Sequence, residues 1–202
     1  MSAQLLSFPT TTTLGHDGQT AVNAARGRAY RRRLRFRLAV LGLDVGDVVG
    51  AAGGWLFDRS MAGWDVTVVA ADVSHCAAAH ILGAQVLNLQ SALRARGKGP
   101  RPQAIAVSAE LFNTNGQLRE GIAETLRDGQ IEVSVWGRLW PDEVSDCLAP
   151  TEHHLTRAAL AFKRSALAAT GQSHDPVCAI EVFRTGRVLR CLPNARDLVP
   201  AG

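Results

Sequence analysis

The chain has few cysteines, and they follow no paired spacing. Only four occur among its 202 residues, at widely separated positions: Cys76, Cys147, Cys178 and Cys191. This pattern does not indicate a disulfide framework. It predicts reduced thiols in a cytoplasmic protein.

Long apolar runs are also lacking. The longest candidate for a membrane-spanning segment, residues 38–57, contains Asp44, Asp47 and several glycines, so we expect no spanning helix. A secretory signal is not expected either, because the lead before this segment is too long and no small-residue cleavage pattern follows. Hydrophobic residues make up 47% of the chain, which is typical of a globular domain and excludes general disorder.

Positive charge is concentrated in one segment. The formal net charge is +4, yet seven arginines between positions 26 and 37 alone carry +7, which leaves −3 for the rest of the chain. This segment is predicted either to be a solvated face or to attract nucleic acid or an acidic protein surface. We favour the solvated face, since Tyr30 and Phe36 are too few aromatics for base stacking. The arginines with a candidate partner-binding role are Arg26, Arg28, Arg31, Arg32, Arg33 and Arg35.

Helical and strand patterns alternate along the chain. We expect residues 1–20 to form a flexible tail and 21–202 a single domain, in which 21–37 is the arginine-rich lead into the first strand. Strands are predicted at 34–41, 65–70, 84–89, 104–107 and 131–135, with helices between them and a long helix from Thr151 to Gly171. Segments 177–183 and 188–192 read as an antiparallel hairpin. The fold class is therefore α/β, in three layers, with a mainly parallel sheet of six to seven strands and a Rossmann-like layout.

Glycine marks the first helix, predicted at 45–62. Gly63 is placed to close it in the left-handed conformation, directly before the next strand. Four glycines inside this helix are unfavourable for helix formation and indicate close approach, either to the sheet behind or to a ligand in front: Gly46, Gly50, Gly53 and Gly54.

Candidate ligand-binding residues follow from the expected architecture. In open α/β sheets, ligands bind beyond the carboxyl ends of the strands, where the strand order reverses. That rule selects seven residues, whose alternative role is to turn the chain and cap helices: Gly42, Asp44, Gly46, Asp72, Ser108, Glu110 and Trp136.

The glycine-rich turn at 42–50 is neither a GxGxxG fingerprint nor a GxxxxGK[ST] phosphate loop. Together with Asp72 after the next strand, and with the helix-to-strand phrase at 126–133, its outline resembles the cofactor half of class I methyltransferases. The resemblance implies a transferase in which Asp72 holds a ribose hydroxyl. Asp47 departs from it by standing where a small residue would admit the cofactor. No cofactor is assigned from the sequence.

Other chemistry-bearing residues are isolated. Cys76 and His80 are i, i+4 beside His75, but a structural zinc needs four ligands, so no metal is predicted. His153 and His154 are placed in the first turn of the long helix, and no serine, cysteine or threonine has a nucleophile context.

The tryptophans fall into two pairs. Trp55 and Trp64 are expected to be packing residues. Trp136 and Trp140 are expected either to wall a pocket or to form an exposed apolar patch that would support a homo-oligomer.

Three functional hypotheses follow. The leading one is a cytoplasmic α/β domain that binds a small molecule, of which a nucleotide is one case, in a regulatory or accessory role. The alternatives are a methyltransferase-like transferase and a nucleic-acid or protein interaction module that uses residues 26–37. The sequence does not decide whether the protein is an enzyme.

Overall fold

The computed structural model describes residues 35–95, 101–138, 148–171, 176–186 and 199–200. Among these residues, helices and strands follow one another in this order: β1 (Arg37–Asp44), α2 (Val45–Met61), β2 (Asp65–Asp72), α3 (Cys76–Ile81), β3 (Gln85–Asn88), α4 (Leu89–Arg94), β4 (Ala104–Ser108), α5 (Ala109–Thr114), α6 (Gly116–Asp128), β5 (Glu132–Trp136), β6 (Leu148–His154), α8 (Arg157–Ala169), β7 (Ile180–Gly186) and β8 (Val199–Pro200).

All the described strands belong to one eight-stranded sheet with the order β3-β2-β1-β4-β5-β7-β6-β8. The first five strands in that order are parallel. Strand β7 runs antiparallel to both β5 and β6, and the two-residue β8 pairs antiparallel with β6. The predicted α/β class with a mainly parallel sheet is confirmed.

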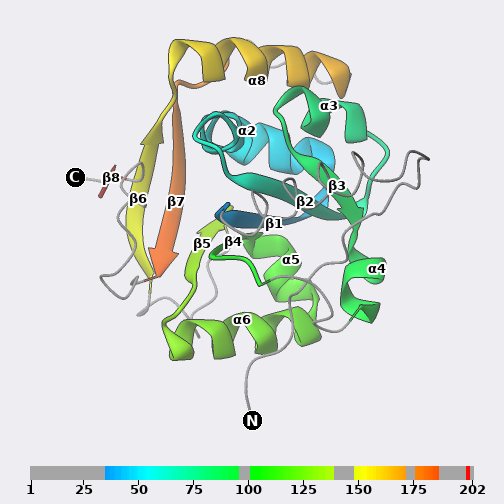
Figure 1. Cartoon of the computed structure of the whole chain (residues 1–202), viewed down its shortest axis with the longest axis vertical. Coiled ribbons are helices and arrows are strands. Elements are labelled where there is room, and N and C mark those ends of the chain that lie inside the picture. The colour runs from blue at the N-terminus through cyan, green and yellow to red at the C-terminus, as the bar shows by residue number, and fades with distance from the viewer. Residues whose placement is uncertain (1–34, 96–100, 139–147, 172–175, 187–198, 201–202) are drawn as a thin grey trace, which may run out of the picture.

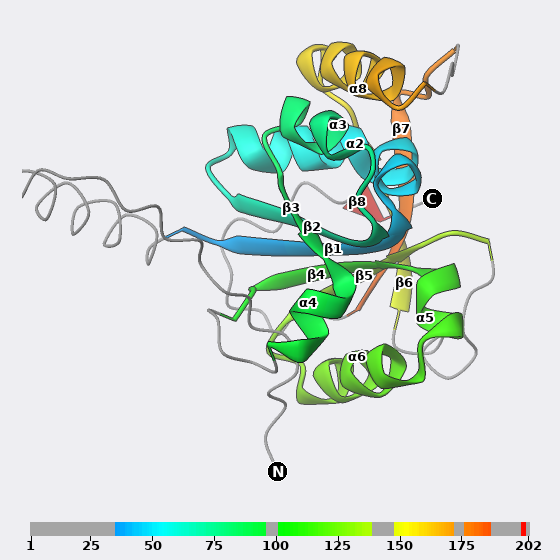
Figure 2. The ribbon, with the colours of Figure 1, turned by 90° about the vertical axis from the view of Figure 1, so that its right-hand side faces the viewer.

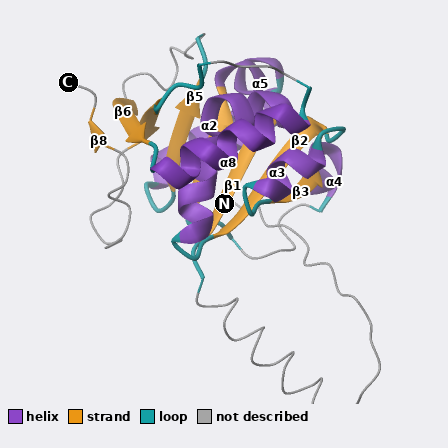
Figure 3. Cartoon of the chain, turned by 90° about the horizontal axis from the view of Figure 1, so that it is seen from above, coloured by secondary structure: helices purple, strands orange, loops and turns teal. Residues whose placement is uncertain are grey.

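Alternation along β1 explains the layers. Leu38 and Val40 face the cluster formed with α2, α3 and α8, whereas Ala39 and Leu41 face the cluster formed with α5 and α6. Helices α2 and α3 therefore cover one face of the sheet, and α5 and α6 cover the other (Figure 1 and Figure 2). Helix α8 packs on the outer side of α2 and α3, as the view from above also shows (Figure 3).

Two glycines of α2, Gly53 and Gly54, lie close to α8 and the residue before it. A Cβ on Gly54 would overlap the side chain of Leu155, just before α8, and a Cβ on Gly53 would lie 3.4 Å from Cγ of Lys163. The sequence analysis expected either the sheet or a ligand to approach these glycines, but the close neighbour at Gly54 is Leu155. Gly63 has a φ of 88°, which confirms the predicted left-handed close of the helix.

The predicted start of the long helix at Thr151 was wrong. Residues 148–154 form β6, and α8 begins at Arg157 with Thr156 as its N-cap. His153 and His154 therefore lie on a strand. Strand β7 pairs with β6 and β5 instead of with segment 188–192, and it continues through Thr185 and Gly186, where the predicted hairpin would turn. Segment 188–192 lies outside the described residues.

Candidate functional site

The strand order reverses between β1 and β4. From β1 the chain builds outward through β2 to β3, then returns to place β4 on the other side of β1. The carboxyl ends of these two neighbouring strands lead directly into α2 and α5. This is the position at which open α/β sheets bind ligands.

Asp44 ends β1 and caps α2. Its Oδ1 accepts a hydrogen bond from the backbone N–H of Asp47 at 2.8 Å. Asp44 thus has the helix-capping role that the sequence analysis gave as its alternative to ligand binding. It satisfies a helical N–H group that would otherwise lack a partner.

Asp47 carries the strongest electrostatic signal of the site. Burial, followed by the negative charges of Asp44 and Glu110, raises the pKa of Asp47 from 3.8 to about 6, while the indole of Trp136 acts in the opposite direction. Its Oδ2 is buried and has no hydrogen-bond partner among the described residues. A buried carboxyl oxygen left unpaired is costly to a fold and is characteristic of functional sites.

Helix α5 contributes from the other side of the switch point. The Oγ of Ser108 is buried and accepts from the backbone N–H of Leu111 at 3.1 Å, so it caps α5. Glu110 is exposed in the first turn of that helix, and its charge reaches Asp47. The sequence did not predict α5 as a helix of its own.

Strand β5 contributes Trp136, its last residue, to the same group of side chains. Trp136 is opposite Ser108 in the parallel register and is 3% exposed. Its Nε1 is buried and makes no hydrogen bond within ordinary geometry to a described residue. Since the side chain is buried, Trp136 is not part of an exposed apolar patch, and Trp140 lies outside the described residues.

The remaining predicted residues have local roles. Gly42 is buried in β1, where a Cβ would overlap Val48 of α2. Gly46 is buried in the first turn of α2. Asp72 is next to Asp44 in the strand register but is exposed, and its Oδ1 accepts from both the backbone N–H and the hydroxyl of Ser74. Those bonds lower the pKa of Asp72.

The site thus unites Asp44, Glu110 and Trp136 around Asp47, a residue that the sequence analysis did not select. One sequence signal could have indicated Asp47. It is a second carboxylate, three residues after a capping aspartate, in an otherwise apolar turn. Of the arginine-rich segment only Arg35 and Arg37 are described, and Arg35 makes an exposed ion pair with Asp65 at 3.4 Å. Arg26, Arg28, Arg31, Arg32 and Arg33 lie outside the described residues.

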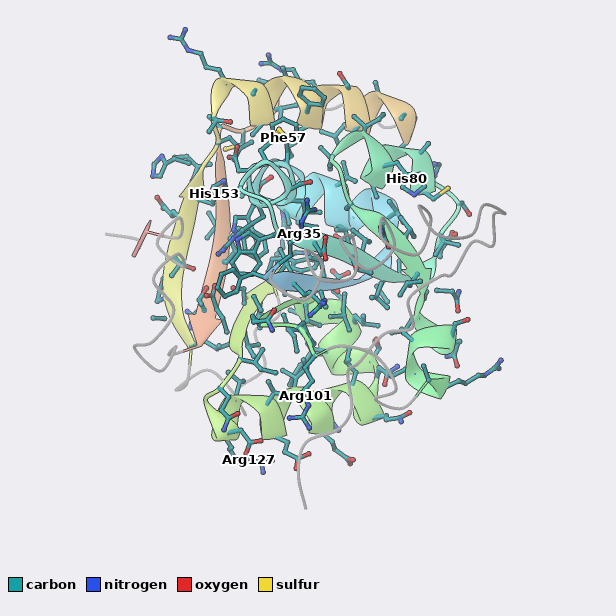
Figure 4. The ribbon with its side chains drawn as sticks, in the orientation of Figure 1. Arg35, Phe57, His80, Arg101, Arg127 and His153 are labelled. Carbon is teal, nitrogen blue, oxygen red and sulfur yellow. The ribbon has the colours of Figure 1, made fainter. Side chains whose placement is uncertain are left out.

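The described residues do not fit a metal centre. They contain no group of three or more His, Cys, Asp or Glu side chains placed to hold an ion. His80 and His153 lie on opposite sides of the molecule (Figure 4). His153 contacts Asp58 of α2, with its Nε2 2.9 Å from Oδ2. Among the described helices, none is long and apolar enough to cross a membrane.

No protein-family model matches the chain, and no curated protein matches its sequence. Solved structures do share its fold. The conserved protein TT1542 from Thermus thermophilus superposes with a TM-score of 0.53 and 14% identity, over 79% of this chain and 98% of that one. The zinc-inhibited form of teicoplanin deacetylase Orf2 gives 0.51 and 10% identity, over 74% and 97%.

The pseudoaglycone deacetylase Dbv21 of the antimicrobial A40926 gives a TM-score of 0.50 and 16% identity, over 76% of this chain and 98% of that one. At these identities the likeness shows the fold alone. Activity has to be argued from the site.

Proposed function

We propose that the protein is a hydrolase that removes an acyl group from the nitrogen of a small molecule, with Asp47 as the group that transfers the proton. The observation that carries this proposal is the Asp47 carboxyl at the β1/β4 switch point, where its pKa is raised to about 6. A general acid–base group works best when its pKa lies near the working pH, so that both protonation states are accessible.

In the proposed hydrolysis, Asp47 first accepts a proton from water and later donates it to the leaving nitrogen. Ionised Asp47 takes a proton from water as the water oxygen bonds to the acyl carbon. The carbon–nitrogen bond then breaks, and Asp47 returns the proton to the departing nitrogen, so that the products are a carboxylic acid and an amine. The hydroxyl of Ser108, at the end of the neighbouring strand β4, is buried and caps α5, so the proposal gives it no nucleophilic role.

The charge of the site constrains the substrate. Asp44 and Glu110 both act on Asp47 as negative charges. Carboxylates at the start of a helix oppose the anion that the helix dipole would attract. Neutral or cationic N-acyl compounds therefore suit the site better than phosphorylated ones. The same argument disfavours a nucleotide ligand.

The fold gives independent, weaker support. Two of the structures that share it, Orf2 and Dbv21, are deacetylases by their descriptions. Because one fold hosts many activities, this likeness raises the prior for acyl hydrolysis without identifying a substrate.

Acetate release from a panel of small N-acetylated amines tests the proposal. The panel should contain neutral, cationic and anionic members. We expect turnover of a neutral or cationic member, and a loss of about 10²–10⁴-fold in Asp47→Asn, as is typical when a general acid–base group is removed. Asp72→Asn is the matched control, because that carboxylate is exposed and engaged with Ser74. Absence of turnover across the panel, or equal rates in Asp47→Asn and the parent, would contradict the proposal.

A second candidate is ligand binding without turnover, in a regulatory or accessory role. It is favoured by the lack, among the described residues, of a metal-ligand group that would assist hydrolysis. Thermal stabilisation by a panel member or by S-adenosylmethionine, without acetate release, would support this candidate over the hydrolase. A partner for residues 26–37 and a cytoplasmic location stay predictions from the sequence.

A further inference from the structure

Two buried polar atoms at the site, one acceptor and one donor, have no hydrogen-bond partner among the described residues. Oδ2 of Asp47 is an acceptor, Nε1 of Trp136 is a donor, and both are buried without a hydrogen bond to any described residue. A buried polar group without a partner is unfavourable, so a fold rarely keeps two of them at one site without a role.

The indole is held firmly by its surroundings. Trp136 is the last residue of β5, is 3% exposed and belongs to the core cluster that also includes Val45 and Val48 of α2. Its N–H already acts on Asp47, since it lowers the pKa of that carboxyl against the combined effect of burial, Asp44 and Glu110. The buried donor and the buried acceptor therefore belong to one group of interacting side chains.

We propose that Trp136 is a positioning residue of the site: its indole N–H donates to Oδ2 of ionised Asp47 and so fixes the orientation of the carboxyl, leaving Oδ1 for the substrate. The proposal rests on the proposed function for its catalytic consequence, but the contact itself is independent of turnover. A charged acceptor forms a shorter and stronger hydrogen bond than a neutral one. The contact should accordingly close when Asp47 loses its proton and loosen when Asp47 gains it.

The indole ¹⁵N–¹H resonances provide a direct test. The chain has four tryptophans, and Trp136→Phe identifies the resonance of interest. We expect the Trp136 signal to move with pH with a midpoint near that of Asp47, and this movement to vanish in Asp47→Asn. Trp64 is the internal control, because it packs against Phe36 and Arg59 in another part of the core. A Trp136 signal that does not move, or that moves equally in Asp47→Asn, would overturn the proposal.

The pH profile of hydrolysis gives a second readout. In Trp136→Phe the acid limb should shift to higher pH, because the carboxylate has lost its donor, and the rate at pH 6 should fall by about tenfold. The rate on the alkaline plateau should change less. Trp64→Phe should leave the limb in place. An unmoved limb in a folded Trp136→Phe protein would contradict a positioning role.

The two tests separate the two proposals. If no substrate is hydrolysed but the Trp136 resonance titrates with Asp47, the hydrolase proposal fails and the contact stands. If hydrolysis depends on Asp47 while the resonance is unaffected by pH, the contact fails and the hydrolase proposal stands. The Trp136 resonance can also be assigned by elimination, from Trp→Phe variants of the other three tryptophans. The test with Asp47→Asn therefore decides the question even if Trp136→Phe does not fold.

Discussion

Two of the carboxyl groups at helix α2, those of Asp47 and Glu181, have opposite environments. Asp47, in the first turn of the helix, has a buried oxygen without a hydrogen-bond partner among the described residues. Glu181 of β7, against the middle of the helix, is 3% exposed and accepts hydrogen bonds through both oxygens. The first carboxyl lies at the parallel, switch-point half of the sheet and the second at the antiparallel half.

The partners of Glu181 come from two elements. Oε1 accepts from the backbone N–H of Gly54 at 2.8 Å and from Nζ of Lys163 at 2.6 Å, and Oε2 accepts from the backbone N–H of Trp55 at 2.8 Å. Lys163 belongs to α8 and is itself buried. One carboxylate therefore joins β7, α2 and α8.

A second polar group reinforces the same half of the molecule. Asp58 of α2 accepts from the Oγ1 of Thr156 at 2.7 Å, and its other oxygen lies 2.9 Å from Nε2 of His153 on β6. Buried charges that are paired in this way hold elements together. A buried charge that lacks such partners is costly to the fold. The contrast agrees with the site proposed at the switch point and with a structural role for the antiparallel half.

The largest effect is expected at Glu181. Glu181→Gln leaves the buried Lys163 without its counter-charge, and we expect the free energy of unfolding to fall by about 3–5 kcal/mol, as when one partner of a buried pair is removed. Chemical denaturation measures it. The double variant Lys163→Met/Glu181→Gln is the control and should recover part of the loss, because the stranded charge is gone. A loss below about 1 kcal/mol in the single variant would mean that Glu181 is not structural.

The glycines of α2 allow a matched pair of substitutions. Gly54→Ala places a methyl group against Leu155, so we expect a destabilisation of about 1–3 kcal/mol from overpacking. Nothing lies within 4 Å of a Cβ at Gly50, and Gly50→Ala should stabilise the protein by about 0.5–1 kcal/mol through helix propensity alone. Thermal denaturation of both variants is sufficient. Equal effects on stability would show that Leu155 does not pack closely against α2 at Gly54.

Local signals predicted the parallel half well. The β-branched run at 66–69, the capping aspartate at 44 and the closing glycine at 63 each act through neighbours in sequence, and each is found where it was expected. Such features are readable because caps, turns and strand propensities depend on a few adjacent residues.

Distant contacts explain what was missed. Residues 148–154 form a strand because β7 pairs with them, and the local sequence of the segment does not predict this pairing. Asp47 was not selected for the same reason: its raised pKa depends in part on Glu110 and Trp136, which come from α5 and β5. The architecture was accessible from local pattern, whereas the character of the site depended on which strand ends meet.

The raised pKa of Asp47 should make the free energy of unfolding depend on pH. The pKa of Asp47 is raised from 3.8 to about 6 on folding, so the folded state prefers the protonated form. The stabilisation associated with this preference is complete below pH 4 and is lost as the pH rises through 6. A shift of this size corresponds to about 3 kcal/mol for a fully buried group, which solvent screening of this half-buried one reduces to about 1–2 kcal/mol.

Asp47→Asn removes the charge and with it this pH dependence. Relative to the parent, the variant should gain about 1–2 kcal/mol between pH 4 and pH 8, because only the parent has to bury a carboxylate at the higher pH. Urea denaturation at both pH values measures the gain. An identical difference between variant and parent at the two pH values would show that Asp47 titrates normally, and the contrast with Glu181 would then be lost.

The smallest effects distinguish the two charges that act on Asp47. Asp44 raises the pKa of Asp47 more than Glu110 does. Asp44→Ser keeps an N-cap acceptor for α2 while removing the charge, so it should lower the pKa of Asp47 with little change in stability. Glu110→Gln should lower it less, and both changes should stay below about tenfold in the proton dissociation constant. Carboxyl ¹³C titration resolves them. A larger effect from Glu110→Gln would mean that α5, rather than the start of α2, sets the electrostatics of the site.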